Sequence, residues 1–407
     1  MSDRARRVIH ECRRIASMTE EAGRTTRRYL TPPMRSVHAH LRERMESLGM
    51  DVGVDAVGNL RGIWEPPESC GNRLIIGSHL DTVPNAGAFD GVLGVVIALE
   101  WVRIAQEMRL NIPLEIIGFS EEEGVRFGVP FLGSRAVAGC FDEGLLHLVD
   151  AEGNSLREVI RDFGLDPSRV ELAVADSHSR GFVEVHIEQG PVLDAAGLSV
   201  AAVTGIVGQT RGTLTFNGHA NHAGTTPMHL RRDALAAAAE WILAVEGLAQ
   251  QCPGLAATVG RIVTEPNAAN VVAGAAAVSL DCRHADDSMR ISAVSQLLEG
   301  ARALAARRRI TVQWAEQLNQ SAVQMDEQLT ALMARVIQEA GLPGTRITSG
   351  AGHDAMIMVK RVPSTMLFLR SPGGVSHDPA ESVTAEDIEA SLLVARRFLE
   401  RFAVNVG

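Results

Sequence analysis

The sequence predicts an α/β protein in which a domain with a mostly parallel sheet is interrupted by a smaller two-layer unit. Apolar runs at 74–76, 114–119 and 182–185 are each followed closely by polar or charged residues, which is typical of buried parallel strands that end at a ligand-binding edge. A long apolar helix over 92–107 separates the first two runs, so the order is that of a strand–helix–strand crossover. Near Gly205 the order of predicted strands and helices changes, and a second pattern begins.

Local patterns predict each element of the first part of the chain. Apolar residues recur at helical spacing near the N-terminus, and Gly49 is a normal stop signal for a helix. An alternating stretch that turns at Gly58-Asn59 indicates a hairpin. The expected elements are helices at 4–18 and 36–48, a hairpin at 51–64, a strand at 73–78, the helix at 92–107 and a strand at 114–119.

The second pattern is that of a self-contained βαββαβ unit, a ferredoxin-like arrangement. Its expected elements are strands at 213–217, 258–264, 277–283 and 310–314 with helices at 233–248 and 287–306. After Asp326 the chain returns to helix–strand alternation, with a buried strand at 365–369 and a closing helix at 385–401. We therefore expect a discontinuous domain of residues 1–210 and 323–407, and an inserted domain of residues 211–322.

Composition argues against several classes of protein. A net charge of −10 with both signs interspersed disfavours a nucleic-acid-binding surface, and no stretch approaches the roughly 20 apolar residues of a membrane span. The N-terminal segment begins an amphipathic helix and lacks the apolar core of a signal peptide, so we expect a cytoplasmic protein. The five cysteines show no paired spacing, which favours buried reduced thiols.

Histidines and carboxylates follow the predicted strands in a pattern that suits two adjacent divalent metals. Such ligands favour zinc or manganese, with cobalt or nickel as alternatives. In this pattern Asp90 can bridge two ions, one of Glu122 and Glu123 can act as a base, and the Asp81 carboxylate can accept a hydrogen bond from the second nitrogen of a liganding imidazole. The proposed set is His79, Asp81, Asp90, Glu122, Glu123, His186 and His377.

Each member of this set also has an ordinary explanation. A His-x-Asp pair is most often a surface or capping pair, and three consecutive glutamates most often form a solvated turn. A histidine in an apolar strand is most often a hydrogen-bonded core residue. The metal hypothesis depends on the coincidence of all these residues at predicted strand ends.

From about residue 30 onward, the chain resembles the M20 metallopeptidase clan, and within it the amidase/hydantoinase/carbamoylase branch. That branch contains N-carbamoyl-L-amino-acid hydrolases, β-ureidopropionases and allantoate amidohydrolases. The motifs that carry the resemblance are Gly77-Ser78-His79-Leu80-Asp81-Thr82, Phe89-Asp90-Gly91, Glu122-Glu123-Gly124, His186-Ile187-Glu188-Gln189-Gly190, Asn221-His222-Ala223-Gly224-Thr225-Thr226-Pro227 and Ser376-His377-Asp378-Pro379-Ala380-Glu381.

The resemblance implies a role for each matching residue. One metal would be held by His79, Asp90 and His186, and the other by Asp90, Glu123 and His377. Glu122 would be the general base, and His222 would polarise the scissile carbonyl. Residues that would orient the substrate or line its pocket are Gln189, Asn270, Arg283 and Gly352, with Arg283 pairing the substrate carboxylate. Ala273 stands where the family usually has proline, and Cys282 and His219 are further departures from its pattern, none at a proposed ligand.

The predicted reaction is hydrolysis of a ureido C–N bond in a small carboxylate, with release of ammonia and carbon dioxide. Neither a Gly-x-Ser-x-Gly elbow nor a convincing cysteine nucleophile is present in the sequence, which disfavours a covalent mechanism. Asn85-Ala86-Gly87 and Phe131-Leu132-Gly133-Ser134 favour allantoate over β-ureidopropionate, and N-carbamoyl-L-amino acids are the close alternative.

Two alternative functions remain open. The first is an aminopeptidase or N-acyl-amino-acid deacylase on the same scaffold, and the second is a metal-binding protein without catalysis. The presence of Glu122 disfavours the last of these. The inserted domain is placed to act as a lid, and the resemblance implies that it also pairs two copies into a homodimer.

Overall fold

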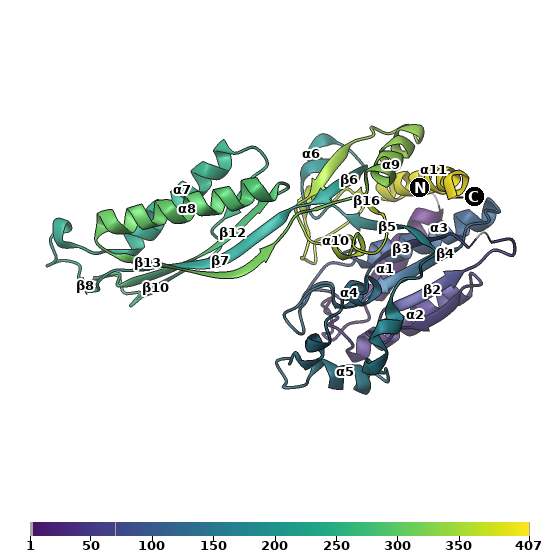
Figure 1. Ribbon diagram of the computed structural model, residues 1–407, viewed down its shortest axis with the longest axis horizontal. Helices are drawn as coiled ribbons and strands as arrows, with labels where there is room; N and C mark the ends of the chain where they lie inside the picture. Colours follow the sequence, from purple (N-terminus) through teal and green to yellow (C-terminus); the bar gives the residue numbers. More distant parts are fainter. Residues whose placement is uncertain (1–2, 70, 407) are drawn as a thin grey trace. The chain divides into compact units, whose positions relative to one another are not determined.

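The computed structural model describes residues 3–69 and 71–406, apart from the side chains of the last two of these. The chain divides into two compact units (Figure 1): the first holds residues 1–204 and 325–407, and the second holds Gly205–Gln324. No helix within the described residues combines the length and the apolar character that crossing a bilayer requires.

A nine-stranded mixed sheet forms the centre of the first unit. Its order is β1-β2-β4-β3-β5-β16-β6-β14, with β15 beside β6. The four middle strands, β4, β3, β5 and β16, run parallel, while β1 and β2 at one side and β6 and β14 at the other pair antiparallel. The strands are β1 (Asp51–Val54), β2 (Leu60–Trp64), β3 (Arg73–His79), β4 (Leu114–Phe119), β5 (Ser179–Ile187), β6 (Val200–Ile206), β14 (Val323–Gln324), β15 (Arg346–Ser349) and β16 (Ser364–Leu369).

The parallel middle of the sheet is buried, which explains the nearly continuous apolar runs of its strands. Helices α1, α3, α9 and α11 pack against one another, and α3 lies on β3, β4 and β5. The helices of this unit are α1 (Asp3–Ala16), α2 (Pro32–Glu46), α3 (Val92–Glu107), α4 (Leu132–Val137), α5 (Leu156–Asp162), α6 (Val192–Ala196), α9 (Glu327–Glu339), α10 (Ala355–Met358) and α11 (Ala385–Val406), with short 3-10 turns η1 (Glu143–His147), η2 (Pro167–Ala173) and η4 (Pro372–Gly374).

The second unit is a five-stranded antiparallel sheet with two helices on one face (Figure 1). Side chains along its long strands alternate between buried and more exposed, because one face lies under the helices and the other is open. The order is β10-β12-β7-β13 with β9 also on β12. Its elements are β7 (Gly208–Asn217), β8 (Asn221–His222), η3 (Met228–Leu230), α7 (Ala234–Gln251), β9 (Ala256–Thr258), β10 (Ile262–Glu265), β11 (Val271–Val272), β12 (Ala275–His284), α8 (Asp287–Arg308) and β13 (Thr311–Gln320).

The predicted fold class is confirmed, and the differences are local. The single strand expected at 258–264 is two short strands, because the register with β12 shifts by one residue between Thr258, opposite Asp281, and Ile262, opposite Val278. At this shift Arg261 donates its peptide N–H to the Ser279 side chain. The strand expected at 310–314 continues to Gln320, and the helix expected at 36–48 already begins at Pro32, since proline suits a first helical turn.

The prediction of buried reduced thiols is correct for only some of the cysteines. The four described cysteines are all free. Cys12 and Cys282 are buried, whereas Cys140 and Cys252 are partly exposed. Cys70 lies outside the described residues.

Candidate metal centre and active site

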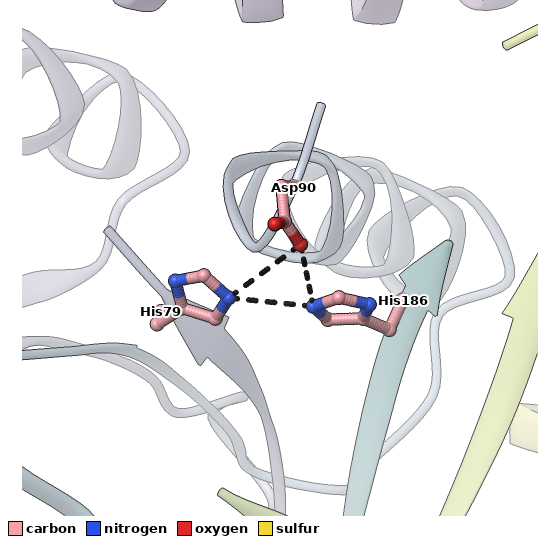
Figure 2. Close-up of side chains that lie close together, drawn as sticks. All are labelled: His79, Asp90 and His186. Carbon is pink, nitrogen blue, oxygen red and sulfur yellow. Dashed lines mark hydrogen bonds and ion pairs between the residues drawn. The ribbon is translucent and has the colours of Figure 1, made fainter. Parts of the chain in front are cut away.

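The carboxyl ends of three adjacent parallel strands bring the first candidate ligands together. His79 is the last residue of β3, His186 is the last but one of β5, and Glu122 and Glu123 follow β4. Because β5 and β4 flank β3, the two histidine rings stack with their centroids 5.5 Å apart. Their Nε2 atoms are separated by 3.3 Å and both face the Asp90 carboxylate (Figure 2).

Asp90 is shared between two groups of possible ligands. Its Oδ1 lies 3.3 Å from His186 Nε2 and 3.9 Å from His79 Nε2, and its Oδ2 lies 3.1 Å from His377 Nε2. The next residue, Gly91, has φ +65°, and a Cβ there would stand 2.5 Å from the His79 ring. Glycine is therefore required for Asp90 to approach the histidines so closely.

The second group consists of Asp90, Glu123 and His377, whose ligand atoms all lie within 4.8 Å of one another. His377 comes from the loop after β16, and its Nε2 is 3.5 Å from Glu123 Oε1. That oxygen is buried and accepts no hydrogen bond from the described residues. A buried acceptor of this kind, facing imidazole nitrogens and a second carboxylate, fits a divalent cation with nitrogen and oxygen ligands.

Backbone carbonyls fix the orientation of the two stacked histidines. His79 Nδ1 lies 3.0 Å from the main-chain oxygen of Asp81, and His186 Nδ1 lies 2.8 Å from that of Ile187. A carbonyl oxygen can only accept, so each Nδ1 carries a proton, and loss of the Nε2 proton would leave a lone pair directed at Asp90. This arrangement presents both rings as metal ligands.

The side chain of Asp81 does not have the partner expected from the sequence. We predicted a bond from the His79 imidazole to the Asp81 carboxylate, but Nδ1 is 3.9 Å from that carboxylate and 3.0 Å from the main-chain oxygen. The carboxylate instead accepts the peptide N–H groups of Glu122 and Glu123, each at 3.1 Å. Asp81 thus links the loop after β3 to the loop after β4.

The consecutive positions of Glu122 and Glu123 predict side chains that point in different directions, one toward a metal and the other toward the substrate water, but the structure differs. An extended chain would point them to opposite sides, yet an oxygen of each lies within 4.8 Å of a His79 nitrogen. The chain is turned here, since Glu121 has φ +53° and Gly124 has φ +66°. Both carboxylates consequently approach the same centre.

Burial and mutual repulsion set the protonation of these groups. Burial, followed by the charges of Glu123 and Asp354, raises the pKa of Glu122 well above its ordinary value. Burial and then Asp90 raise the pKa of Glu123 to about 7. Because several carboxylates lie close together here, ionisation of Glu122 and Glu123 is unfavourable unless cations balance their charge.

The pKa values of the two stacked histidines shift in opposite directions. Burial opposes protonation of His79, but the charges of Asp81 and Asp90 outweigh it and raise its pKa to about 9. Burial lowers the pKa of His186 to about 4. For Asp90, burial acts against ionisation, yet the hydrogen bond from His377 and the neighbouring imidazoles hold its pKa well below the ordinary range.

Two further predicted residues lie in this unit. Gln189, with φ +58°, donates its side-chain amide to Asp90 Oδ1 and Oδ2 at 3.0 and 3.2 Å, so it contacts a candidate ligand directly. Gly352 faces Phe131, whose ring would be 2.9 Å from an added Cβ. Phe131 in turn donates its peptide N–H to the Glu122 carbonyl.

A buried polar layer next to His186 was not predicted. Glu184, His186 and His353 place ligand-type atoms within 4.8 Å of one another, and all three are buried. The Glu184 carboxylate is already hydrogen-bonded by Ser78 and by the peptide N–H of Ala355. Its sequence signal was a charged residue inside an apolar strand, which is rare without a buried partner.

The remaining predicted residues belong to the second unit. His222 Nδ1 accepts the peptide N–H groups of Gly224 and Thr225, so Nε2 carries the proton in the neutral ring. Asn270 supports the same loop, because its carbonyl accepts the N–H of Ala223. This loop therefore presents the Nε2–H of His222 as a donor.

Arg283 lies on the open face of the second sheet. Its guanidinium donates to both oxygens of Asp281, and Arg211 donates to the same carboxylate. These residues line a hollow of about 490 Å³ together with Thr258 and Ser279. The geometry places two guanidinium groups at this hollow.

Comparison with known proteins identifies the family. The model of peptidase family M20/M25/M40 matches residues 75–401. The chain belongs to this family. A probable allantoate deiminase of Oryza sativa subsp. japonica is 35% identical, covering 98% of this chain and 89% of the relative. An N-carbamoyl-L-amino acid amidohydrolase of Geobacillus stearothermophilus is 37% identical, covering 90% and 91%.

A solved structure agrees with the family assignment. The amidase of the hydantoinase/carbamoylase family from Burkholderia multivorans superposes with a TM-score of 0.91 at 29% identity, covering 98% of this chain and 97% of that one. The M20 match begins inside β3 and ends inside α11, so it includes every candidate metal ligand.

Proposed function

We propose that this M20-family protein is a metal-dependent amidohydrolase that cleaves a ureido C–N bond in a small carboxylate, with allantoate as the substrate. The observation that carries the proposal is the shared position of Asp90 between His79 and His186 on one side and Glu123 and His377 on the other. A carboxylate between two ligand groups suits a pair of cations.

Two divalent ions would be held by these residues: one by His79, Asp90 and His186, the other by Asp90, Glu123 and His377. Zinc or manganese fits the nitrogen and oxygen ligands, and cobalt and nickel are the alternatives. Such ions, when bound, polarise a carbonyl oxygen and lower the pKa of a water molecule.

The chain's own groups would move the protons. Glu122 would take a proton from the water that adds to the ureido carbon and would return it to the nitrogen that leaves. The C–N bond then breaks, and the released carbamic acid decomposes to ammonia and carbon dioxide. The buried position of Glu122 supports this role, because burial raises the pKa of its carboxyl group and so makes the ionised carboxylate a stronger proton acceptor.

The second unit would supply contacts to the substrate. The Nε2–H of His222 would stabilise the negative charge that develops on the carbonyl oxygen, and the backbone bonds to its Nδ1 support that tautomer. Arg283 would bind the substrate carboxylate, as the position of its guanidinium at the hollow supports. Gln189 and Asn270 would orient the ureido group, and Gly352 would leave room for it.

N-carbamoyl-L-amino acids are the second candidate substrate. The relative from Geobacillus stearothermophilus, which bears that activity in its name, is as similar to this chain as the rice relative is. Both substrates present a ureido group and a carboxylate, so both fit the same residues. Allantoate carries a second ureido group.

We also propose that the second unit is a lid and forms a homodimer. The supporting observations are the edge position of β10, where Ile262 and Val263 are exposed, and the exposed Leu235 and Leu243 of α7. An exposed apolar edge strand is a natural site for pairing with another chain.

The test uses protein stripped of metal and reloaded with one metal at a time. It measures ammonia release from allantoate, N-carbamoyl-L-amino acids and β-ureidopropionate, and free amino-acid release from dipeptides. Activity on allantoate that disappears on stripping and returns with zinc or manganese supports the proposal. A preference for carbamoyl amino acids would select the second candidate. Activity on dipeptides alone would refute a ureido substrate.

A further inference from the structure

Glu381 is a buried carboxylate for which the proposed reaction has no use. It lies four residues after His377, in the loop between β16 and α11, and its side chain is almost fully buried. Burial of a charged group is costly unless polar partners compensate for it. The partners of Glu381 therefore indicate what it does.

Those partners are the main chain of the residue that both metal groups share. Glu381 Oε1 accepts the peptide N–H of Phe89 at 2.9 Å and that of Asp90 at 3.0 Å. Its Oε2 lies 3.5 Å from the Ser376 hydroxyl. One carboxyl oxygen thus accepts two consecutive peptide N–H groups, so Glu381 anchors the peptide at Asp90.

Gly87 provides the space that this contact requires. A Cβ on Gly87 would stand 2.4 Å from Glu381 Cβ and 2.4 Å from its Oε1. The first of these atoms cannot turn away as the end of a flexible side chain could. Only glycine at position 87 lets the two loops approach closely enough for Glu381 to reach the Asp90 peptide.

The turn that carries Glu381 also carries His377. The peptide N–H of Glu381 donates to the carbonyl of Asp378, and that of Ala380 donates to the Asp378 side chain. His377 itself has φ +56°, an uncommon value for a residue other than glycine. A rigid turn thus connects the His377 imidazole to the Glu381 carboxylate, and both end at Asp90.

We propose that Glu381 is a positioning residue that holds Asp90 and His377 in register, so that the Asp90–Glu123–His377 group can bind its metal. This inference rests on the proposed function. It requires no contact between Glu381 and the metal or the substrate. Loss of an outer partner of this kind typically costs about 10- to 100-fold in metal affinity.

The experiment measures zinc and cobalt binding to the full-length metal-free protein by competition with a chromophoric chelator. The variants are Glu381→Ala, Glu381→Gln and Gly87→Ala, with Glu386→Gln as a control at an exposed position of α11. Thermal unfolding of each metal-free variant reports folding, and the visible spectrum of bound cobalt reports coordination geometry.

We expect two ions per chain in the wild type and the control. In Glu381→Ala and Gly87→Ala the ion of the Asp90–Glu123–His377 group should bind about 10- to 100-fold more weakly. The other ion shares only Asp90 with that group, so its affinity should fall less. Glu381→Gln should be intermediate, because its amide oxygen can still accept both N–H groups without the charge. Excess metal should restore turnover, and metal-free unfolding of at least the Gln variant should match the wild type.

The two proposals fail in different ways. A wild type that binds fewer than two ions overturns the proposed function, and with it this inference. A wild type that binds two ions, together with variants that bind two ions at the same affinity, overturns this inference alone. An equal loss of affinity for both ions would also contradict this inference, because Glu381 would then support the whole site rather than the His377 group.

Discussion

Replacement of Glu122 by glutamine separates a general base from a metal ligand. The substitution keeps the shape of the side chain and removes its ability to take up a proton. The main chain at this position is held independently, because its N–H donates to Asp81 and its carbonyl accepts from Phe131. We therefore expect the loop after β4 to keep its conformation in Glu122→Gln.

The magnitude follows from the environment of the carboxyl group. A positioned general base contributes about 10²- to 10⁴-fold in rate, which is about 3–5 kcal/mol of the activation barrier. Glu122 is only 7% exposed, so bulk water has little access to replace it. We expect kcat to fall by at least about 10²-fold with a small change in KM.

The assay is ammonia release from allantoate and from an N-carbamoyl-L-amino acid, with elemental analysis of the same samples. Metal content should stay at the wild-type level, because both groups that share Asp90 exclude Glu122. Glu143→Gln, at an exposed position in η1, is the matched control and should keep full activity.

Two results would refute this reasoning. Turnover near the wild-type rate would mean that Glu122 is not the base. Loss of metal would mean that Glu122 is itself a ligand, as part of the third group that it forms with His79 and Glu123. The second result would leave the base to be found among the other buried carboxylates.

Three further predictions concern substrate binding, assembly and stability. Arg283→Ala should lower kcat/KM for the free-acid substrate by a factor equivalent to about 2–4 kcal/mol of transition-state stabilisation. Equal activity of the wild type on the free acid and on its amide would contradict the binding of a substrate carboxylate by Arg283. Mixing Glu122→Gln with His222→Ala chains should restore partial activity if His222 acts across a homodimer; proven heterodimers without recovery would argue against it. Burial and nearby arginines lower the pKa of His38 to about 4, from an ordinary 6.5. The contribution of neutral His38 to the free energy of unfolding is therefore complete above pH 6.5 and is lost as pH falls toward 4, at up to about 1.4 kcal/mol per pH unit. In urea unfolding, the free energy of unfolding of His38→Leu should fall less between pH 7 and pH 5 than that of the wild type.

The sequence was sufficient to predict that His79, Glu123 and His186 would lie at one edge of the sheet. His79, Glu123 and His186 follow or end apolar runs, and the carboxyl ends of adjacent parallel strands share one edge of a sheet. That argument needs only the strand type and the order of elements. It needs no knowledge of loop conformation, which explains why it succeeds for groups so far apart in the chain.

The hydrogen bonds around these residues could not be predicted in the same way. The Asp81 carboxylate binds two peptide N–H groups because the chain after β4 turns through a residue with positive φ, and Glu381 reaches Asp90 because Gly87 lacks a side chain. Such contacts depend on individual loop dihedrals. Alternation of apolar residues carries no information about them.

The interrupted strand of the second unit has a similar cause. Residues 258–264 are expected to form one strand, but the pairing with β12 shifts register between β9 and β10, where Arg261 donates to the Ser279 side chain. A side chain competes here with a backbone partner, and the strand pattern is the same in either case. Edge strands tolerate the break because only one neighbour depends on them.

The inserted second unit places a particular demand on the site. His377 and Glu381 come from the chain that returns after the insertion, whereas Asp90 comes from the part before it. Pairing of β16 with β5 sets the register of the returning chain, since Phe368 lies opposite His186. The strand alone fixes position only up to residue 369, and the loop beyond it must still deliver His377. Glu381 closes that gap by accepting hydrogen bonds from the peptide N–H groups of Phe89 and Asp90, which ties the last candidate ligand to the one that both groups share.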